Sequence, residues 1–233
     1  MFRVKHVNFE EIFNVYTSSD TLDPNEWADT SRLKEQGWEN RYAYEAEVIC
    51  DVIRDNPTPI KSILEVGSGP GILSQKIQSK LNGDVVYHLI DKPYAEKYFK
   101  DNNFRGTFFI KDISLDLDKT CLLQSYDLII CNDTLEHLLA PTNVIKRFYE
   151  LTTENSRVFI SVPNWRMAHQ FVYRGLWDYD NFLYLMYSHK FDVIEVYPSI
   201  LQTQPYPKLS SESEMPDELT QSWNWYFNLK KRK

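Results

Sequence analysis

The chain has 233 residues, of which 42% are hydrophobic and 25% are charged, so its composition is that of a soluble globular protein with one sizeable core. Its net charge of −7 excludes a general nucleic-acid binder, because such a protein needs a basic face. The 3 cysteines follow neither a disulfide framework nor zinc-ligand spacing, and the residues after Met1 lack the pattern of a signal peptide. No apolar run reaches the length of a membrane span, so we expect a soluble, cytoplasmic protein without a membrane partner.

We expect residues 1–233 to form a single α/β domain that begins with a cap segment over residues 1–40. A helix is predicted over residues 40–55, where apolar residues such as Ala46, Ile49 and Ile53 recur on one helical face. Beyond it, predicted strands alternate with predicted helices, which implies βαβ units and a mainly parallel sheet. The strands are predicted at residues 62–66, 84–91, 107–111, 126–131, 157–162 and 192–197, and the helices at 71–81, 93–100 and 141–151.

The last predicted element is an aromatic strand over residues 223–229. The segment before it, residues 202–221, is rich in Pro, Ser and Glu and leaves no room for a crossover helix of normal length. A strand that returns without such a helix runs antiparallel to its neighbour. The sequence therefore predicts one antiparallel strand in an otherwise parallel sheet.

The most informative motif lies between the first predicted strand and the helix that follows it. Glu65 precedes three alternate glycines, at positions 67, 69 and 71. Glycine has no Cβ, so this loop can turn sharply and bring backbone N–H groups close to a bound molecule. A strand, a glycine loop and a helix start form a nucleotide-type pocket, although glycines in this number also occur in a plain turn.

Acidic residues also stand where the next two predicted strands end. In an open α/β sheet, ligands bind beyond the carboxyl ends of the strands. Asp91 suits both hydroxyls of a ribose, and Asp112 suits an amino group such as that of adenine, with Ile113 as an apolar flank for the ring. Each acid also has a plainer interpretation, Asp91 as a helix cap and Asp112 as a turn residue. Suitable residues at three successive strand ends together favour an adenosine site.

These motifs make the chain similar to the class I S-adenosylmethionine-dependent methyltransferases, in the type 11/23-like group with a Glu-x-Gly-x-Gly-x-Gly loop. The resemblance covers roughly residues 40–200 and, more weakly, the final strand. It implies a Rossmann-like three-layer sandwich with a seven-stranded, mainly parallel sheet whose last strand is antiparallel. It also implies contacts with S-adenosyl-L-methionine from Glu65, Gly67, Ser68, Gly69, Gly71, Asp91, Lys92, Asp112, Ile113, Asn132 and Asp133.

The loop itself argues against a dinucleotide. A pyrophosphate-binding loop follows Gly-x-Gly-x-x-Gly, whereas here the third glycine comes one residue early. Glu65 would repel a diphosphate but suits a ligand with a cationic sulfonium and an amino group. Two alternatives stay open, an NAD(P)-dependent oxidoreductase or epimerase and a non-catalytic protein that binds S-adenosylmethionine.

The segment after the fourth predicted strand carries Asp133, Glu136 and His137 at positions i, i+3 and i+4, which places them on one face of a helix. One interpretation is a capping-box-like helix start, in which the two acids accept bonds from backbone N–H groups. Another is general-base catalysis by His137 or Asp133, since histidine titrates near neutral pH. The trio also resembles the carboxylate-x-x-Glu-His cluster of metal-assisted O-methyltransferases. Asp replaces Glu at its first position, and we assign no metal site.

The substrate side is expected to form from the cap segment and from residues 164–190, an aromatic-rich insertion. In the insertion, Trp165, Tyr173 and Trp177 either line a pocket or pack in the core. Arg41 either pairs with the methionine carboxylate of the cofactor or is exposed, as most arginines are. We therefore expect methyl transfer to an oxygen or nitrogen nucleophile of a small molecule, with no nucleic-acid partner.

Overall fold

The computed structural model describes residues 38–81, 83–92, 95, 104–118, 120, 122–164, 173–201, 204–205, 209–210 and 224–233. Nearly all of the predicted cap segment and most of the predicted helix at 93–100 lie outside these residues. The α-helices within them are α4 (Trp38–Asp55), α5 (Ile72–Lys80), α7 (Pro141–Glu150) and α8 (Tyr179–Ser188), and the 3-10 helices are η1 (Leu135–His137) and η2 (Arg174–Trp177).

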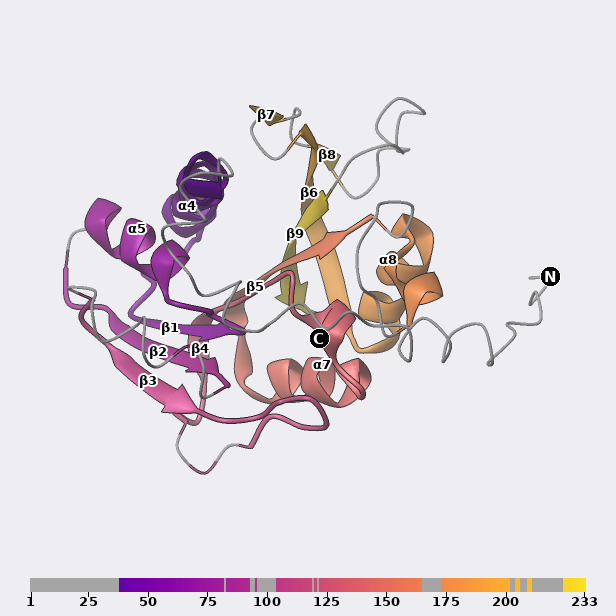
Figure 1. Ribbon diagram of the computed structural model, residues 1–233, viewed down its shortest axis with the longest axis horizontal. Helices are drawn as coiled ribbons and strands as arrows, with labels where there is room; N and C mark the ends of the chain where they lie inside the picture. The colour runs from indigo at the N-terminus through magenta and orange to yellow at the C-terminus, as the bar shows by residue number, and fades with distance from the viewer. Residues whose placement is uncertain are drawn as a thin grey trace.

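The strands form one sheet (Figure 1). They are β1 (Ser62–Val66), β2 (Val86–Asp91), β3 (Thr107–Ile110), β4 (Tyr126–Asn132), β5 (Thr152–Pro163), β6 (Phe191–Leu201), β7 (Gln204–Pro205), β8 (Leu209–Ser210) and β9 (Asn224–Lys231). Their order is β3-β2-β1-β4-β5-β9-β6-β7, and β8 pairs with β6. Strands β1 to β5 pair in parallel, whereas β9 lies between β5 and β6 and is antiparallel to both. The predicted seven-stranded sheet with an antiparallel last strand is thus confirmed, with β7 and β8 as short additions.

Helices cover both faces of the sheet, with α4 and α5 on one side and α7 and α8 on the other (Figure 1). Successive residues of a strand point to opposite faces. Accordingly Ile63 of β1 packs in the cluster that contains Ile49 of α4, while Leu64 packs in the cluster that contains Phe148 of α7. This arrangement is the expected three-layer sandwich, and it explains why β4 is almost continuously apolar.

The element boundaries differ from the prediction mainly at β5. This strand begins at Thr152, earlier than predicted. The prediction missed its first residues because they are polar and show no apolar run. Part of the aromatic-rich insertion forms a helix, α8, which buries Phe182 and Met186 against the sheet. None of the helices in the described ranges is long and apolar enough to cross a membrane.

Parallel pairing brings the carboxyl ends of the central strands to one edge. Strand β1 pairs with β2 through Val66 and Ile90, and with β4 through Glu65 and Ile130. The loops that follow β1, β2 and β4 therefore start side by side, at the edge where open α/β sheets bind ligands.

Candidate active site

The glycine loop connects β1 to α5 through left-handed backbone conformations. Gly67, Gly69 and Gly71 have φ angles of 74°, 51° and 76°, a region that favours glycine. The N–H of Gly67 donates to Ile90 O at 2.9 Å, and the N–H of Gly71 donates to Ser68 O at 2.9 Å. The motif thus forms the sharp turn that its sequence predicts.

Glu65 lies near the end of β1, beneath this loop, and is only 4% exposed. The hydroxyl of Ser74 on α5 donates to its carboxylate. Burial raises the pKa of Glu65 to about 8, and the nearby charges of Glu45 and Asp91 act in the same direction. A carboxyl group in this state carries a proton at neutral pH and gains from a cation placed beside it.

Asp91 ends β2 and holds the glycine loop from the neighbouring strand. Its Oδ2 accepts a hydrogen bond from the N–H of Gly69 at 2.5 Å, and its Oδ1 accepts one from the N–H of Lys92 at 2.6 Å. The residue is 7% exposed. The structure therefore brings Asp91, Glu65 and the loop to one edge of the sheet, as the adenosine-site prediction requires.

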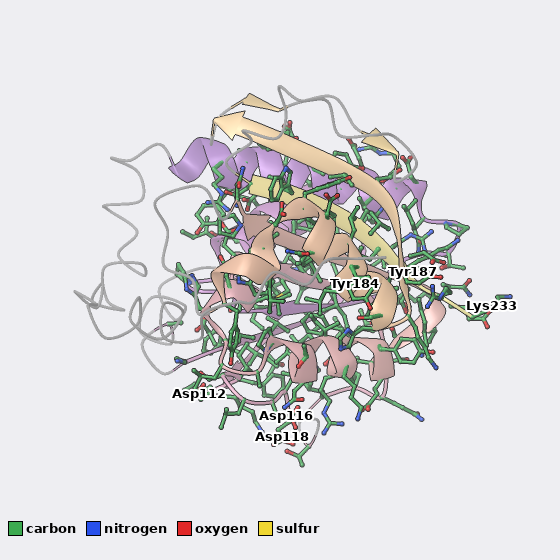
Figure 2. The ribbon with its side chains drawn as sticks, turned by 90° about the vertical axis from the view of Figure 1, so that its right-hand side faces the viewer. Asp112, Asp116, Asp118, Tyr184, Tyr187 and Lys233 are labelled. Carbon is green, nitrogen blue, oxygen red and sulfur yellow. The ribbon has the colours of Figure 1, made fainter. Side chains whose placement is uncertain are left out.

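Asp112 lies in the turn after β3, at the surface. Figure 2 shows it on the same edge of the molecule as Asp116 and Asp118. Its Oδ1 accepts from the N–H of Ser114 at 2.8 Å and lies 3.8 Å from Nζ of Lys92. Hydrogen bonds from Ser114 hold the pKa of Asp112 below its usual value. Asp112 therefore acts as a turn residue, which is the plainer of the two interpretations given above.

The two remaining predicted cofactor contacts in this region are buried. Ser68 is 7% exposed within the glycine loop. Ile113 is 4% exposed and packs in the core beneath α7. Its side chain is thus part of the hydrophobic core at the carboxyl end of β3.

The chain leaves β4 through Asn132, Asp133 and Thr134. Asp133 has a φ of 44°, which is uncommon for a residue other than glycine. Thr134 packs so closely against Gly67 that a Cβ added to this glycine would overlap its side chain. The segment after β4 therefore lies directly against the glycine loop.

Asp133 is held by side chains from three elements. Its Oδ2 pairs with Nη2 of Arg41 on α4, and its Oδ1 accepts from Ser161 Oγ at 2.8 Å and Asn224 Nδ2 at 2.6 Å. Nε of Arg41 donates to Glu45 Oε1 at 2.7 Å. Arg41 is 5% exposed, so the expectation of an exposed arginine is wrong. It is buried because two carboxylates supply opposite charge on either side of it.

Glu45, which no sequence motif marks, connects this group to the last strand. It is 1% exposed and accepts from the hydroxyl of Tyr226 on β9 at 2.9 Å and, at 3.4 Å, from Nδ2 of Asn132. Its spacing from Arg41 could have indicated a helical ion pair, but nothing local could have indicated its burial. We refer to Arg41, Glu45 and Asp133 as the buried ion cluster.

The structure corrects the prediction that Asp133, Glu136 and His137 share a helix face. Only the last two lie in η1, where Glu136 is fully buried and the His137 side chain is 42% exposed. No side chain caps η1, so the capping-box interpretation is wrong. Burial raises the pKa of Glu136, while His137, whose Nε2 lies 3.7 Å from Glu136 Oε1, opposes the shift. The described residues contain no group of three side chains able to hold a metal ion.

In the aromatic insertion, two of the three candidate pocket residues are described. Trp177 is fully buried and packs against Phe182, so it belongs to the core. Tyr173 is half-buried, and its hydroxyl donates to Leu139 O at 2.8 Å, next to η1. Trp165 lies outside the described residues.

Comparison with known proteins identifies the class. The family described as "Methyltransferase domain" matches residues 37–194, more than half of the chain, so the chain belongs to it. It is a class I S-adenosylmethionine-dependent methyltransferase, as the sequence resemblance implied. No curated protein matches the chain in sequence.

Solved structures share the fold at low sequence identity. The plantazolicin methyltransferase BpumL in complex with S-adenosylhomocysteine (SAH) superposes with a TM-score of 0.63 at 15% identity, over 97% of this chain and 99% of that one. For an S-adenosylmethionine-dependent methyltransferase from Clostridium acetobutylicum, the TM-score is 0.59 at 11% identity, over 97% of this chain and 98% of that one. For the CurJ carbon methyltransferase, the TM-score is 0.63 at 14% identity, over 91% of this chain and 62% of that one. These likenesses concern the fold.

The residues at this edge of the sheet fit S-adenosylmethionine. The cofactor carries a sulfonium and an ammonium, and the edge presents Glu65 and Asp91 beside the glycine loop, with the buried ion cluster next to them. A dinucleotide diphosphate would meet these carboxylates unfavourably. Charge and loop geometry therefore agree with the family.

Proposed function

We propose that this protein transfers a methyl group from S-adenosylmethionine to a hydroxyl or amine of a small-molecule acceptor. The observation that carries the proposal is the convergence of Glu65, Asp91 and the glycine loop at one edge of the sheet, where the N–H of Gly69 lies 2.5 Å from the Asp91 carboxylate. S-adenosylmethionine supplies a methyl group already activated by the positive charge on sulfur. The protein must mainly align the acceptor and exclude water.

Each residue has a separate role in holding the cofactor under this proposal. Asp91 accepts hydrogen bonds from the ribose hydroxyls, and Asp112 with Ile113 borders the adenine. Glu65, Asn132 and the loop glycines surround the methionine end. We do not assign Arg41 to the methionine carboxylate, because its guanidinium already pairs with Glu45 and Asp133.

His137 is the group that accepts the proton of the acceptor. Its side chain is 42% exposed next to the glycine-loop contact of Thr134, within reach of a solvent-borne molecule. Asp133 was the other candidate, but Arg41, Ser161 and Asn224 all bind its two oxygens. These contacts suit Asp133 to holding Arg41 in place.

The acceptor is a small molecule that reaches the site beside the aromatic insertion. The net charge of −7 disfavours nucleic acid, and Tyr173 lies against Leu139 next to η1. Proteins of the same fold act on varied acceptors, since one is named a plantazolicin methyltransferase and another a carbon methyltransferase. A proton-accepting histidine favours a hydroxyl or amine acceptor for this chain.

Calorimetric titration with S-adenosylmethionine tests the cofactor site. We expect micromolar binding by the wild type and at least about tenfold weaker binding by Asp91→Ala, because charged hydrogen bonds to the ribose are lost. Asp118→Asn, on the exposed edge seen in Figure 2, is the matched control and should bind like the wild type. No binding by the wild type, or equal binding by Asp91→Ala, contradicts the proposal.

A screen with a radiolabelled methyl donor tests the acceptor class. Pools of small hydroxyl and amine compounds, and parallel samples of nucleic acid and of other proteins, are incubated with this protein, with and without magnesium or zinc. Label in a small molecule supports the proposal. Label that appears only in nucleic acid or protein contradicts it.

A further inference from the structure

We propose that Glu45 is a positioning residue for the amino-acid end of the cofactor, and that it acts by fixing the orientation of the Asn132 side-chain amide. In that orientation, Asn132 Oδ1 accepts a hydrogen bond from the methionine ammonium. The inference rests on the cofactor site proposed above. It assigns a role to a residue on α4 that lies far from the glycine motif in sequence.

Asn132 stands where the cofactor's amino-acid end meets the sheet. It is the last residue of β4, two positions beyond Ile130, which pairs with Glu65 of β1. Thr134, two residues on, packs directly against the same glycine. The side chain of Asn132 therefore starts between α4 and the glycine loop.

Glu45 determines which way the amide faces. Nδ2 of Asn132 lies 3.4 Å from Glu45 Oε2, so the NH2 group donates to the carboxylate. If the amide were turned round, its oxygen would face a carboxylate oxygen, and neither atom could donate. The burial of Glu45, which is 1% exposed, leaves little water to relieve that repulsion.

This orientation directs the amide oxygen away from Glu45. Asn132 Oδ1 is buried, and it has no hydrogen-bond partner among the residues that the structure describes. A buried acceptor without a donor is costly, and few occur in folded proteins. A ligand that brings an N–H donor to this atom removes the cost.

The ammonium of the cofactor is the donor that the surroundings favour. The charges of Glu45 and Asp91 both act on Glu65, so three carboxylates influence this region together. A cationic donor gains from the charges of Glu45 and Asp91 and favours the ionisation of Glu65, whereas a neutral donor gains only the hydrogen bond. The amide oxygen is thus oriented toward the charged end of S-adenosylmethionine.

Replacing Glu45 by glutamine reverses the amide in a predictable way. Glu45 Oε1 accepts from Nε of Arg41 at 2.7 Å and from the hydroxyl of Tyr226 at 2.9 Å. A glutamine keeps its one carbonyl oxygen toward these two donors, and its NH2 group then faces Nδ2 of Asn132. Two donors cannot pair, so the Asn132 amide turns and presents its own NH2 group to the ligand.

Calorimetry with two matched ligands tests this inference. The first is SAH, and the second is the same molecule with hydrogen in place of the amino group. We expect the wild type to prefer SAH by at least about tenfold, as a charged hydrogen bond implies. Glu45→Gln should lose this preference while it binds the deaminated analogue as the wild type does. A purely structural role of Glu45 would weaken the binding of both ligands.

A double variant provides the rescue. In Glu45→Gln combined with Asn132→Asp, one carboxylate oxygen accepts from the glutamine NH2 group and the other faces the ligand, so the preference for SAH should return. Equal losses for both ligands, an unchanged preference in Glu45→Gln, or a double variant without recovery overturns the inference. If the wild type binds both ligands equally, the inference about Glu45 fails but the cofactor site stands. If the wild type binds neither ligand, the proposed cofactor site itself is refuted.

Discussion

The binding of S-adenosylmethionine should release a proton from Glu65, and the structure gives the size of the effect. Burial raises the pKa of this carboxyl group to about 8 in the free protein. At pH 7 only about a tenth of the molecules then carry an ionised Glu65. A cationic ligand binds the ionised form better, so binding at pH 7 should release about 0.9 proton from this group.

The affinity follows from the same fraction. If only the ionised form binds, the apparent dissociation constant at pH 7 is about tenfold larger than the intrinsic one. The ionisation of Glu65 by itself should lower this constant about tenfold between pH 7 and pH 9. Glu65→Gln keeps the shape of the side chain but cannot titrate, so its affinity should lack this component of the pH dependence.

Calorimetry in two buffers with different ionisation enthalpies measures the proton release directly. The amino group of the ligand also titrates, but it contributes equally to the wild type and to Glu65→Gln, so the difference between them isolates Glu65. Glu47→Gln, which removes an exposed carboxylate from α4, should behave as the wild type does. Equal proton release by the wild type and Glu65→Gln would refute the reasoning.

The same pKa shift predicts the pH dependence of stability in the free protein. The folded-state pKa of Glu65 lies above its ordinary value of 4.5, so the folded state binds the proton more tightly than the unfolded chain does. Its contribution to stability is therefore fully present below about pH 4.5 and is lost as the pH rises through about 8. Urea titrations should show the free energies of unfolding of the wild type and Glu65→Gln moving apart over this pH interval. At its alkaline end the variant should be the more stable of the two.

Four further substitutions test other parts of the site. Gly67→Ala should lower the free energy of unfolding by more than about 2 kcal/mol, because its Cβ would overlap Thr134 at a positive φ. Gly69→Ala has open space around it, so thermal unfolding should show a loss of only about 1 kcal/mol. His137→Gln should leave calorimetric binding of SAH unchanged but slow methyl transfer by about a hundredfold or more, and equal turnover would exclude it as the base. Arg41→Met should lower the free energy of unfolding by about 3–5 kcal/mol in urea titrations at neutral pH, since it leaves two carboxylates without their cation. An unchanged free energy of unfolding would show that the buried ion cluster is not stabilising.

The parts of the fold that depend on local patterns could be predicted from the sequence. The glycine loop was recognisable because alternate glycines after an apolar strand suit few other structures, and the three glycines do adopt positive φ angles. The direction of β9 could be inferred from a connection too short for a crossover helix, and its antiparallel pairing with β5 and β6 confirms this. The polar start of β5 at Thr152 was missed because that segment lacks any apolar periodicity.

The segment after β4 shows where a pattern misleads. The spacing of Asp133, Glu136 and His137 indicates one helical face only if the backbone is helical from the first residue. A φ of 44° at Asp133 breaks that condition, and the side chain is directed to Arg41 instead. Tertiary partners determine this conformation, so no window of local sequence could have revealed it.

The buried ion cluster was beyond prediction for a related reason, and it shows why the last strand matters to the site. Arg41 and Glu45 alone resemble an ordinary exposed ion pair on a helix. They are buried because Tyr226 of β9 donates to Glu45 and Asn224, at the start of the same strand, donates to Asp133. An antiparallel strand inserted beside β5 thus supplies the polar partners that let α4 bring charges to the carboxyl edge of the sheet. The final strand therefore contributes to the proposed cofactor site through the residues it holds in place, even though it lies far from the glycine motif in sequence.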